Sequence, residues 1–221
     1  MTAEQQPVIA FIGGGNMAEA ILGGLYRFYP HSLLRFSEPL DERREYMSQK
    51  YPDVWSTNDN QEVVQGADMI ILAVKPQVLR PVVQGVANVL RQSRPLVISI
   101  AAGIETAAIV RWLGADDIPV VRIMPNTPAL IGEGAVGLFA TTIVTQEQRQ
   151  LTEQLMGAIS KQLSWVKDES LIDTITGVSG SGPAYFFLIM EAMGKIDFES
   201  TTLDNSLIAF IYRKCRCGSR S

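Results

Sequence analysis

Short, wholly apolar runs recur along the first three quarters of the chain and alternate with segments whose apolar residues have helical spacing. Each run is rich in β-branched residues and several end in glycine or proline, which is typical of strands buried on both faces. Strands are predicted in PVIAFIGG (7–14), LLRFSE (33–38), DMIILAVKP (68–76), LVISIAAG (96–103) and PVVRIMP (119–125). We therefore expect an α/β fold: a Rossmann-type doubly wound parallel sheet with helices on both faces.

The intervening segments predict the helices. In the first of them, Met17, Ile21 and Leu25 fall on one face. A polar helix follows Pro39, and Asp41 is expected at its N-cap. The other expected helices are a short one at Val63 and Val64, then 77–91, 105–113, 146–161 and a very apolar one at 184–193. The stretch DESLIDTITG (168–177) marks the passage out of the sheet, so we predict domains over 1–166 and 167–221.

Composition narrows the class of protein. The 221 residues carry 19 basic and 23 acidic side chains, a net charge of −4, which argues against a nucleic-acid partner. No apolar run is long enough to cross a membrane, and no positive charge precedes Arg27 to form a signal peptide. Cys215 and Cys217 form a lone Cys-x-Cys pair, too few ligands for a zinc site. We expect a cytoplasmic protein with no metal and no membrane partner.

One glycine-rich loop has the spacing of a dinucleotide site. Gly13 to Ala18 match G-x-G-x-x-A directly after a predicted strand and at the start of a predicted helix. Gly13 permits the tight turn, Gly15 lets a pyrophosphate approach the backbone, and Ala18 lets helix and strand pack closely. The helix N-terminus then favours the phosphate charge. The predicted cofactor contacts in this loop are Ile12, Gly13, Gly14, Gly15, Asn16 and Met17.

The next strand bears on the choice of dinucleotide. Glu38, which ends this strand, stands where an acidic residue would hold the ribose 2′-hydroxyl of NADH. Ser37 beside it and the nearby Arg43 could instead meet the 2′-phosphate of NADPH. Arg44 is better read as a solvated charge at the helix start. We predict NADPH as the cofactor, with NADH as the alternative.

Five stretches identify a family. FIGGGNMAEAILGGL (11–25), AVKPQ (73–77), ISIAAG (98–103), RIMPNTPALIGEGA (122–135) and ITGVSGSGPAYFFLIMEAM (175–193), in this order, closely resemble pyrroline-5-carboxylate reductase. The resemblance covers residues 8–193. It implies a homo-oligomeric oxidoreductase that reduces 1-pyrroline-5-carboxylate to L-proline with hydride from NAD(P)H, the last step of proline biosynthesis.

The resemblance also implies site residues. The substrate carboxylate would be gripped at the helix N-terminus that follows the second glycine loop, by Ser179, Gly180, Ser181, Gly182 and Pro183. Further cofactor contacts would come from Asn58, Ala73, Val74, Lys75, Pro76, Ala101, Ala102 and Gly103. Glu169 is either near the substrate or a solvated charge at a helix start. Asn126 and Thr127 either line the nicotinamide pocket or brace the turn between two prolines.

No catalytic side chain is assigned. A protonated imine accepts hydride without a strong protein acid, so the reaction mainly needs positioning and an anion site. His31, the chain's one histidine, is expected at the surface.

The tail departs from the family. From residue 194 we expect the sequence to depart from the amphipathic helices that the resemblance implies, and from the serine–glycine–threonine loop that would reach the imine. We therefore interpret 167–221 as the remnant of a helical substrate and dimerisation domain, and expect weak dimers and impaired turnover. An alternative is a catalytically silent, truncated NADP-binding fragment that associates with an intact reductase. A reductase of another imine or keto acid is disfavoured by the complete SGSGPAY stretch.

Overall fold

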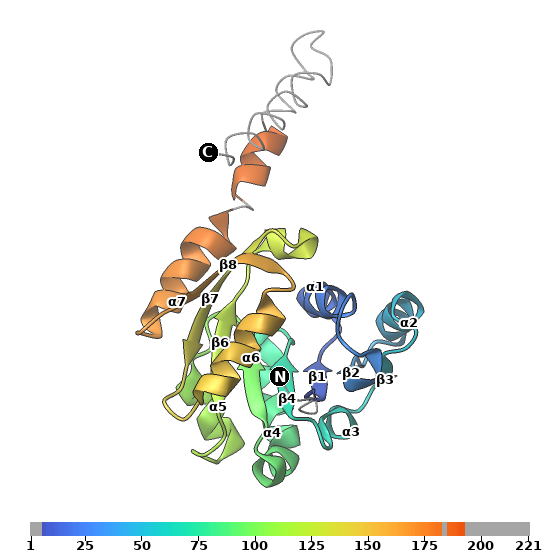
Figure 1. The fold of residues 1–221 in the computed structure, drawn as a ribbon. Helices are drawn as coiled ribbons and strands as arrows, with labels where there is room; N and C mark the ends of the chain where they lie inside the picture. Colours follow the sequence, from blue (N-terminus) through green and yellow to red (C-terminus); the bar gives the residue numbers. More distant parts are fainter. Residues whose placement is uncertain (1–5, 183–184, 193–221) are drawn as a thin grey trace. The chain divides into compact units, whose positions relative to one another are not determined.

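A computed structural model describes residues 6–182 and 185–192 (Figure 1). The chain divides into two compact units after Gly180. The first unit thus extends beyond the boundary predicted at residue 166. It does so because helix α7 (Ser170–Ile175) packs against strands β6 and β7 of the sheet.

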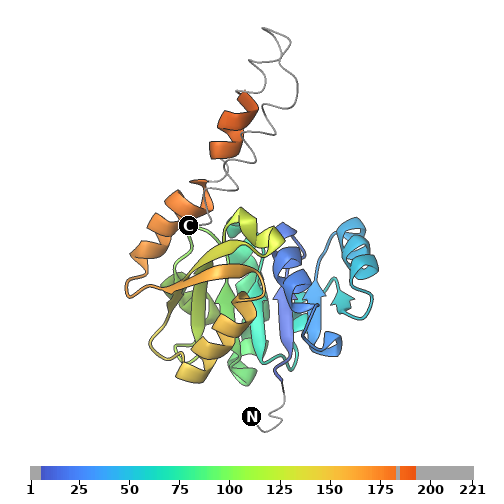
Figure 2. The same cartoon turned by 45° about the horizontal axis from the view of Figure 1, so that its top comes forward.

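The first unit is built on one eight-stranded sheet with the order β3-β2-β1-β4-β5-β6-β7-β8 (Figures 1 and 2). Its strands are β1 (Ile9–Ile12), β2 (Leu34–Ser37), β3 (Trp55–Thr57), β4 (Met69–Leu72), β5 (Leu96–Ser99), β6 (Val120–Met124), β7 (Gly134–Ala140) and β8 (Ser160–Trp165). Strands β1, β4 and β5 are buried at every position, as their continuous apolar sequences predict.

The sheet is not wholly parallel, which corrects one expectation. Strand β7 pairs antiparallel with β6, and β8 then pairs parallel with β7. The reason is the connection: residues 125–133 contain a short 3₁₀ turn, η2 (Thr127–Ile131), and no crossover helix. A parallel return needs a dozen or more residues, so this shorter segment reverses the chain.

Helices cover both faces of the sheet (Figure 2). One apolar core lies between the sheet and α1 (Asn16–Leu25), α2 (Asp41–Lys50) and α6 (Gln146–Met156). A second lies between the other face and α3 (Asn60–Val64), α4 (Pro76–Ser93) and α5 (Thr106–Leu113). The doubly wound arrangement is therefore confirmed.

Three local expectations differ from the structure. Helix α2 has Leu40 at its N-cap and Asp41 as its first helical residue. Helix α6 begins with a capping box between Thr145 and Gln148 but ends at Met156, so the predicted helix to 161 is too long. Strand β3 was not expected, because YPDVWSTND is polar and its strand is only three residues long.

In the second unit, residues 185–192 are helical. Five consecutive large apolar side chains of this helix are at least half exposed, from Tyr185 at 60% and Phe186 at 70% to Ile189 at 54%. The expectations for Pro183 and for the tail from residue 194 lie outside the described residues. Within the described residues, no helix is long and apolar enough to span a membrane.

Candidate functional site

Two groups of predicted cofactor residues, 12–17 and 73–76, lie at the carboxyl ends of β1 and β4, the two strands between which the strand order reverses. The backbone N–H of Ala73 donates to the carbonyl of Ile12 at 2.8 Å, so the loops that follow these strands start side by side. In open α/β sheets, ligands bind in the crevice at such a reversal.

The glycine loop has the geometry that a pyrophosphate needs. Gly13 has φ +101°, and a Cβ there would lie 2.8 Å from the carbonyl oxygen of Ala73. Gly15 is the N-cap of α1 and has no side-chain cap. A Cβ on Gly15 would have nothing within 4 Å, so the space in front of the helix N-terminus is open. Asn16 and Met17 begin α1, and their N–H groups belong to the unsatisfied first turn. These features fit a bound dinucleotide.

Glu38 holds the glycine loop in place. Its side chain is buried, with one carboxylate oxygen accepting the N–H of Gly14 at 2.9 Å and the other that of Leu40 at 3.0 Å. Both oxygens therefore hold backbone in place. Each retains a lone pair, so an additional bond to a ribose hydroxyl remains chemically available.

The two residues predicted to favour NADPH are both engaged. The hydroxyl of Ser37 donates to Oδ1 of Asn60 at 2.6 Å. Arg43 donates through Nε to the carbonyl of Gly14 at 2.6 Å and through Nη2 to Glu19 at 2.5 Å. A 2′-phosphate would have to draw the guanidinium of Arg43 away from Glu19.

The other predicted cofactor residues line the same edge of the sheet. Lys75 is the exposed N-cap of α4, and Pro76 is the helix's first residue. Ala101 is buried after β5, and Gly103 has φ +70°. Asn58 borders an open cavity of about 590 Å³ between the start of α3 and the middle of α4. This cavity is lined by Asn58, Asp59, Asn60, Gln61, Pro81, Val82, Gly85 and Val86.

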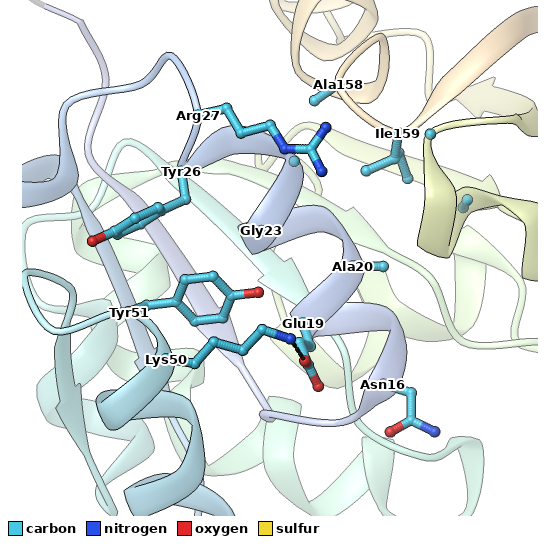
Figure 3. Close-up of a pocket in the computed structure, with 13 residues that line it drawn as sticks. Asn16, Glu19, Ala20, Gly23, Tyr26, Arg27, Lys50, Tyr51, Ala158 and Ile159 are labelled. Carbon is cyan, nitrogen blue, oxygen red and sulfur yellow. Dashed lines mark hydrogen bonds and ion pairs between the residues drawn. The ribbon is translucent and has the colours of Figure 1, made fainter.

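A groove of about 480 Å³ runs along the outer side of α1 (Figure 3). Glu19 lies within it and binds Nζ of Lys50 at 2.6 Å. Burial raises the pKa of Glu19, but hydrogen bonds from Lys50 and Arg43 outweigh it, so the pKa is lowered overall. The hydroxyl of Tyr51 points at α1, where a Cβ on Gly23 would be 2.5 Å away. Gly23 is thus needed for close packing of α2 on α1.

Glu169 proves to be a brace for α7. Its two carboxylate oxygens accept the N–H and the hydroxyl of Thr106, each at 2.7 Å, at the first residue of α5. Arg122 of β6, whose side chain is 1% exposed, lies 3.3 Å from Glu169 and 2.6 Å from Asp173. Glu169 and Asp173 together therefore fasten α7 to α5 and to the centre of β6.

The turn after α7 carries Ser179 and Gly180, the first residues of the second glycine loop, to the carboxyl end of β6. A Cβ on Gly137 of β7 would lie 2.5 Å from Cδ1 of Ile175, so this glycine lets α7 pack closely on the sheet. A π-helical turn, Thr176–Gly180, follows α7. In it, Ser179 accepts a hydrogen bond from Nδ2 of Asn126 at 3.2 Å. Asn126 of the MPNTPA stretch and Ser179 of the SGSGP stretch, far apart in sequence, thus meet. Ser181 and Gly182 belong to the second unit, and Pro183 is not described.

Sequence reasoning missed three residues of this arrangement: Thr106, Arg122 and Asp173. Arg122 had a signal, because it is one charge inside the otherwise apolar strand VVRIM. His31 stacks on Tyr26 with ring centroids 3.7 Å apart, at the amino end of β2 and thus away from the glycine loop. Across the described ranges, no group of three or more His, Cys, Asp or Glu could hold a metal ion.

Two family models match the chain. Residues 8–103 match "NADP oxidoreductase coenzyme F420-dependent", which covers the glycine loop and the strands around it. Residues 169–203 match "Pyrroline-5-carboxylate reductase dimerisation". The likeness to the family therefore extends past Met193, where the sequence was expected to diverge, as far as residue 203.

Individual relatives agree. The pyrroline-5-carboxylate reductase of Pseudomonas aeruginosa is 47% identical over 189 residues, which are 85% of this chain and 67% of the relative. That of Pasteurella multocida is 44% identical over 192 residues, 86% of this chain and 69% of the relative. The solved structure of the pyrroline-5-carboxylate reductase of Coxiella burnetii is 37% identical and has a TM-score of 0.85. The match covers 96% of this chain and 77% of the Coxiella chain. The chain belongs to the pyrroline-5-carboxylate reductase family.

Proposed function

We propose that this chain binds NADPH and reduces 1-pyrroline-5-carboxylate to L-proline. The observation that carries the proposal is the contact between Asn126 and Ser179, one residue from each of two family motifs, at one edge of the sheet. The Asn126–Ser179 hydrogen bond supports the proposal, because it brings Ser179, the first residue of the SGSGP stretch, to the carboxyl end of β6, on the edge where the glycine loop opens.

The chain's residues mainly bind and orient. The N-terminus of α1 would hold the cofactor's pyrophosphate in the open space at Gly15. The small residues Ala101 and Ala102 after β5 would let the nicotinamide approach, and the bound cofactor supplies the hydride. The imine, protonated at its nitrogen, would take this hydride at its carbon, so the C=N bond becomes the C–N bond of the proline ring. No strong acid on the protein is required.

We place the substrate's carboxylate at the turn containing Ser179 and Gly180. Both residues are partly buried in the first unit. The family resemblance assigns Ser181, Gly182 and Pro183 to the same anion site, where Ser181 and Gly182 could donate backbone N–H groups and Pro183, which has none, could not. Glu169 would support this site indirectly, because it holds α7 in place and does not itself bind the substrate.

NADPH is preferred over NADH in this proposal because Arg43 lies next to the glycine loop. Its ion pair with Glu19 is 2.5 Å long, and the Arg43 side chain is 25% exposed, so a 2′-phosphate could replace Glu19 as its partner. We expect Arg43→Ala to weaken NADPH binding about tenfold or more while changing NADH binding less than threefold. An equal loss for both cofactors would contradict this assignment.

We further propose a homodimer in the cytoplasm, formed through the segment that matches the dimerisation model. The helix 185–192 presents Phe186 and Leu188 at 70% and 65% exposure, and such a patch of large apolar side chains marks an interaction site. A second copy of the same helix is the occupant that the family match favours. Sedimentation at several concentrations tests this, and a monomer at all of them would refute it.

The activity is tested with purified chain, NADPH and 1-pyrroline-5-carboxylate. Oxidation of NADPH that requires the pyrroline, with L-proline as the product, is expected. A matched control is Gly15→Ala, which keeps the fold but blocks the pyrophosphate. Oxidation with a keto acid in place of the pyrroline would indicate another substrate class.

A further inference from the structure

We propose that Asn126 is a positioning residue that fixes the hydroxyl of Ser179 as a hydrogen-bond donor to the substrate's carboxylate. The inference rests on the proposed function. It gives Asn126 a role different from the two that the sequence left open, which were lining the nicotinamide pocket and bracing the turn.

The geometry defines which way the amide of Asn126 points. Its Oδ1 accepts the backbone N–H of Ala135, near the start of β7, at 3.0 Å. A backbone N–H can only donate, so the atom facing Ala135 must be the oxygen. The amide nitrogen therefore faces Ser179, whose Oγ lies 3.2 Å away.

This orientation determines what the hydroxyl of Ser179 can do. A serine hydroxyl has one proton and two lone pairs, and an amide N–H can only be accepted by a lone pair. The proton of Ser179 is thus directed away from Asn126. Among the described residues it has no acceptor. The complementary ligand is an acceptor-only group, and the carboxylate of a small imino acid is one.

Both partners are held by rigid elements. Asn126 directly follows buried Pro125 at the end of β6, and its Oδ1 is tied to β7. Ser179 follows α7. This helix packs closely on the sheet at Gly137, and Glu169 holds it to α5. A Cβ on Gly180 would lie 2.9 Å from Cε of Met124, so the turn itself lies close against β6.

The test exploits a change of polarity at constant shape. In Asn126→Asp, one carboxylate oxygen still accepts the N–H of Ala135, but the other can only accept. The hydroxyl of Ser179 would then turn and donate to Asp at 126, leaving the ligand without its donor. The paired variants are Ser179→Ala and the double variant, and Asn88→Asp on the exposed face of α4 is the matched charge control.

The readout is the calorimetric Kd of L-proline with the full chain saturated by NADP⁺, together with KM and kcat for the pyrroline. We expect Asn126→Asp and Ser179→Ala each to raise Kd and KM about tenfold or more, with kcat within threefold and NADP⁺ binding unchanged. In the Ser179→Ala background, Asn126→Asp should add less than twofold. The effect of Asn126→Asp on Kd and KM should become smaller as pH falls and the new carboxyl is protonated. A protonated carboxyl can again donate a hydrogen bond to the hydroxyl of Ser179.

Other outcomes decide against the proposal. If Asn126→Asp adds its full factor in the Ser179→Ala background, the effect is charge repulsion or distortion and the inference is overturned. A wild-type chain that binds no L-proline also overturns it. A wild-type chain that binds L-proline but does not oxidise NADPH refutes the proposed activity, while the calorimetric cycle still decides the role of Asn126.

Discussion

Replacing Glu169 by alanine should cost much more than replacing the neighbouring Asp173. Glu169→Ala removes the acceptor for two donors of Thr106, the backbone N–H and the hydroxyl, both 2.7 Å away. It also removes one of the two carboxylates that face Arg122, whose side chain is 1% exposed. Buried donors without partners are expensive, because they lose their hydration and gain nothing in return.

The magnitude follows from the contacts. Hydrogen bonds to a charged group contribute about 1.5–3 kcal/mol each. The side chain of Glu169 is 19% exposed, so water can partly replace it, and we expect a net loss of about 3–4 kcal/mol. Asp173 is 59% exposed on its side chain, and Asp173→Asn should cost less than about 1 kcal/mol. Glu169→Gln keeps one acceptor oxygen and should fall between them.

Urea unfolding followed by tryptophan fluorescence measures the three losses, and thermal unfolding provides a second measure. At about 2–4 °C for each kcal/mol in a domain of this size, Glu169→Ala should lower Tm by roughly 6–16 °C. The reasoning is refuted if Glu169→Ala lies within about 1 kcal/mol of the wild type, or if Asp173→Asn is as damaging as Glu169→Ala.

Three further predictions concern the first unit. Gly15→Ala should leave urea stability unchanged but abolish NADPH binding by fluorescence titration, because its Cβ enters open space in front of α1; retained binding would place the pyrophosphate elsewhere. Glu19→Gln should lower stability by about 1 kcal/mol at pH 7. The folded pKa of Glu19 lies below its ordinary 4.5, so its contribution is present above pH 4.5 and disappears as pH falls through the folded value. Urea curves at pH 7 and pH 3 check this, and a difference that persists undiminished at pH 3 would contradict it. Thr145→Ala breaks the capping box of α6 and should cost about 1 kcal/mol in urea, against no loss for Thr142→Ala outside any helix.

The sequence was most informative where one local signal dictates structure. The apolar runs at β1, β4 and β5 identified buried strands because both faces of a central strand must be apolar. The glycine spacing predicted the tight turn after β1, since only a glycine such as Gly13 tolerates φ +101° against the carbonyl of Ala73. These features depend on residues that are neighbours in the chain.

Features that depend on distant residues could not be predicted in this way. Thr106 and Glu169 are 63 residues apart, and nothing near either one indicates their pairing. The antiparallel pairing of β7 with β6 depends on the segment that connects them. The sequence shows how long this segment is but not the course that its backbone takes. Asn126 could be recognised as important from its motif, but its partner Ser179 is 53 residues away and only the fold brings them together.

The most direct test of the central claim is the NADPH absorbance of the purified chain on addition of 1-pyrroline-5-carboxylate. The account predicts a loss of absorbance that requires the pyrroline, stops in Gly15→Ala and yields L-proline in equal amount. A chain that binds NADPH tightly but never oxidises it with the pyrroline would contradict the proposed reaction. It would favour a nucleotide-binding protein without turnover of its own.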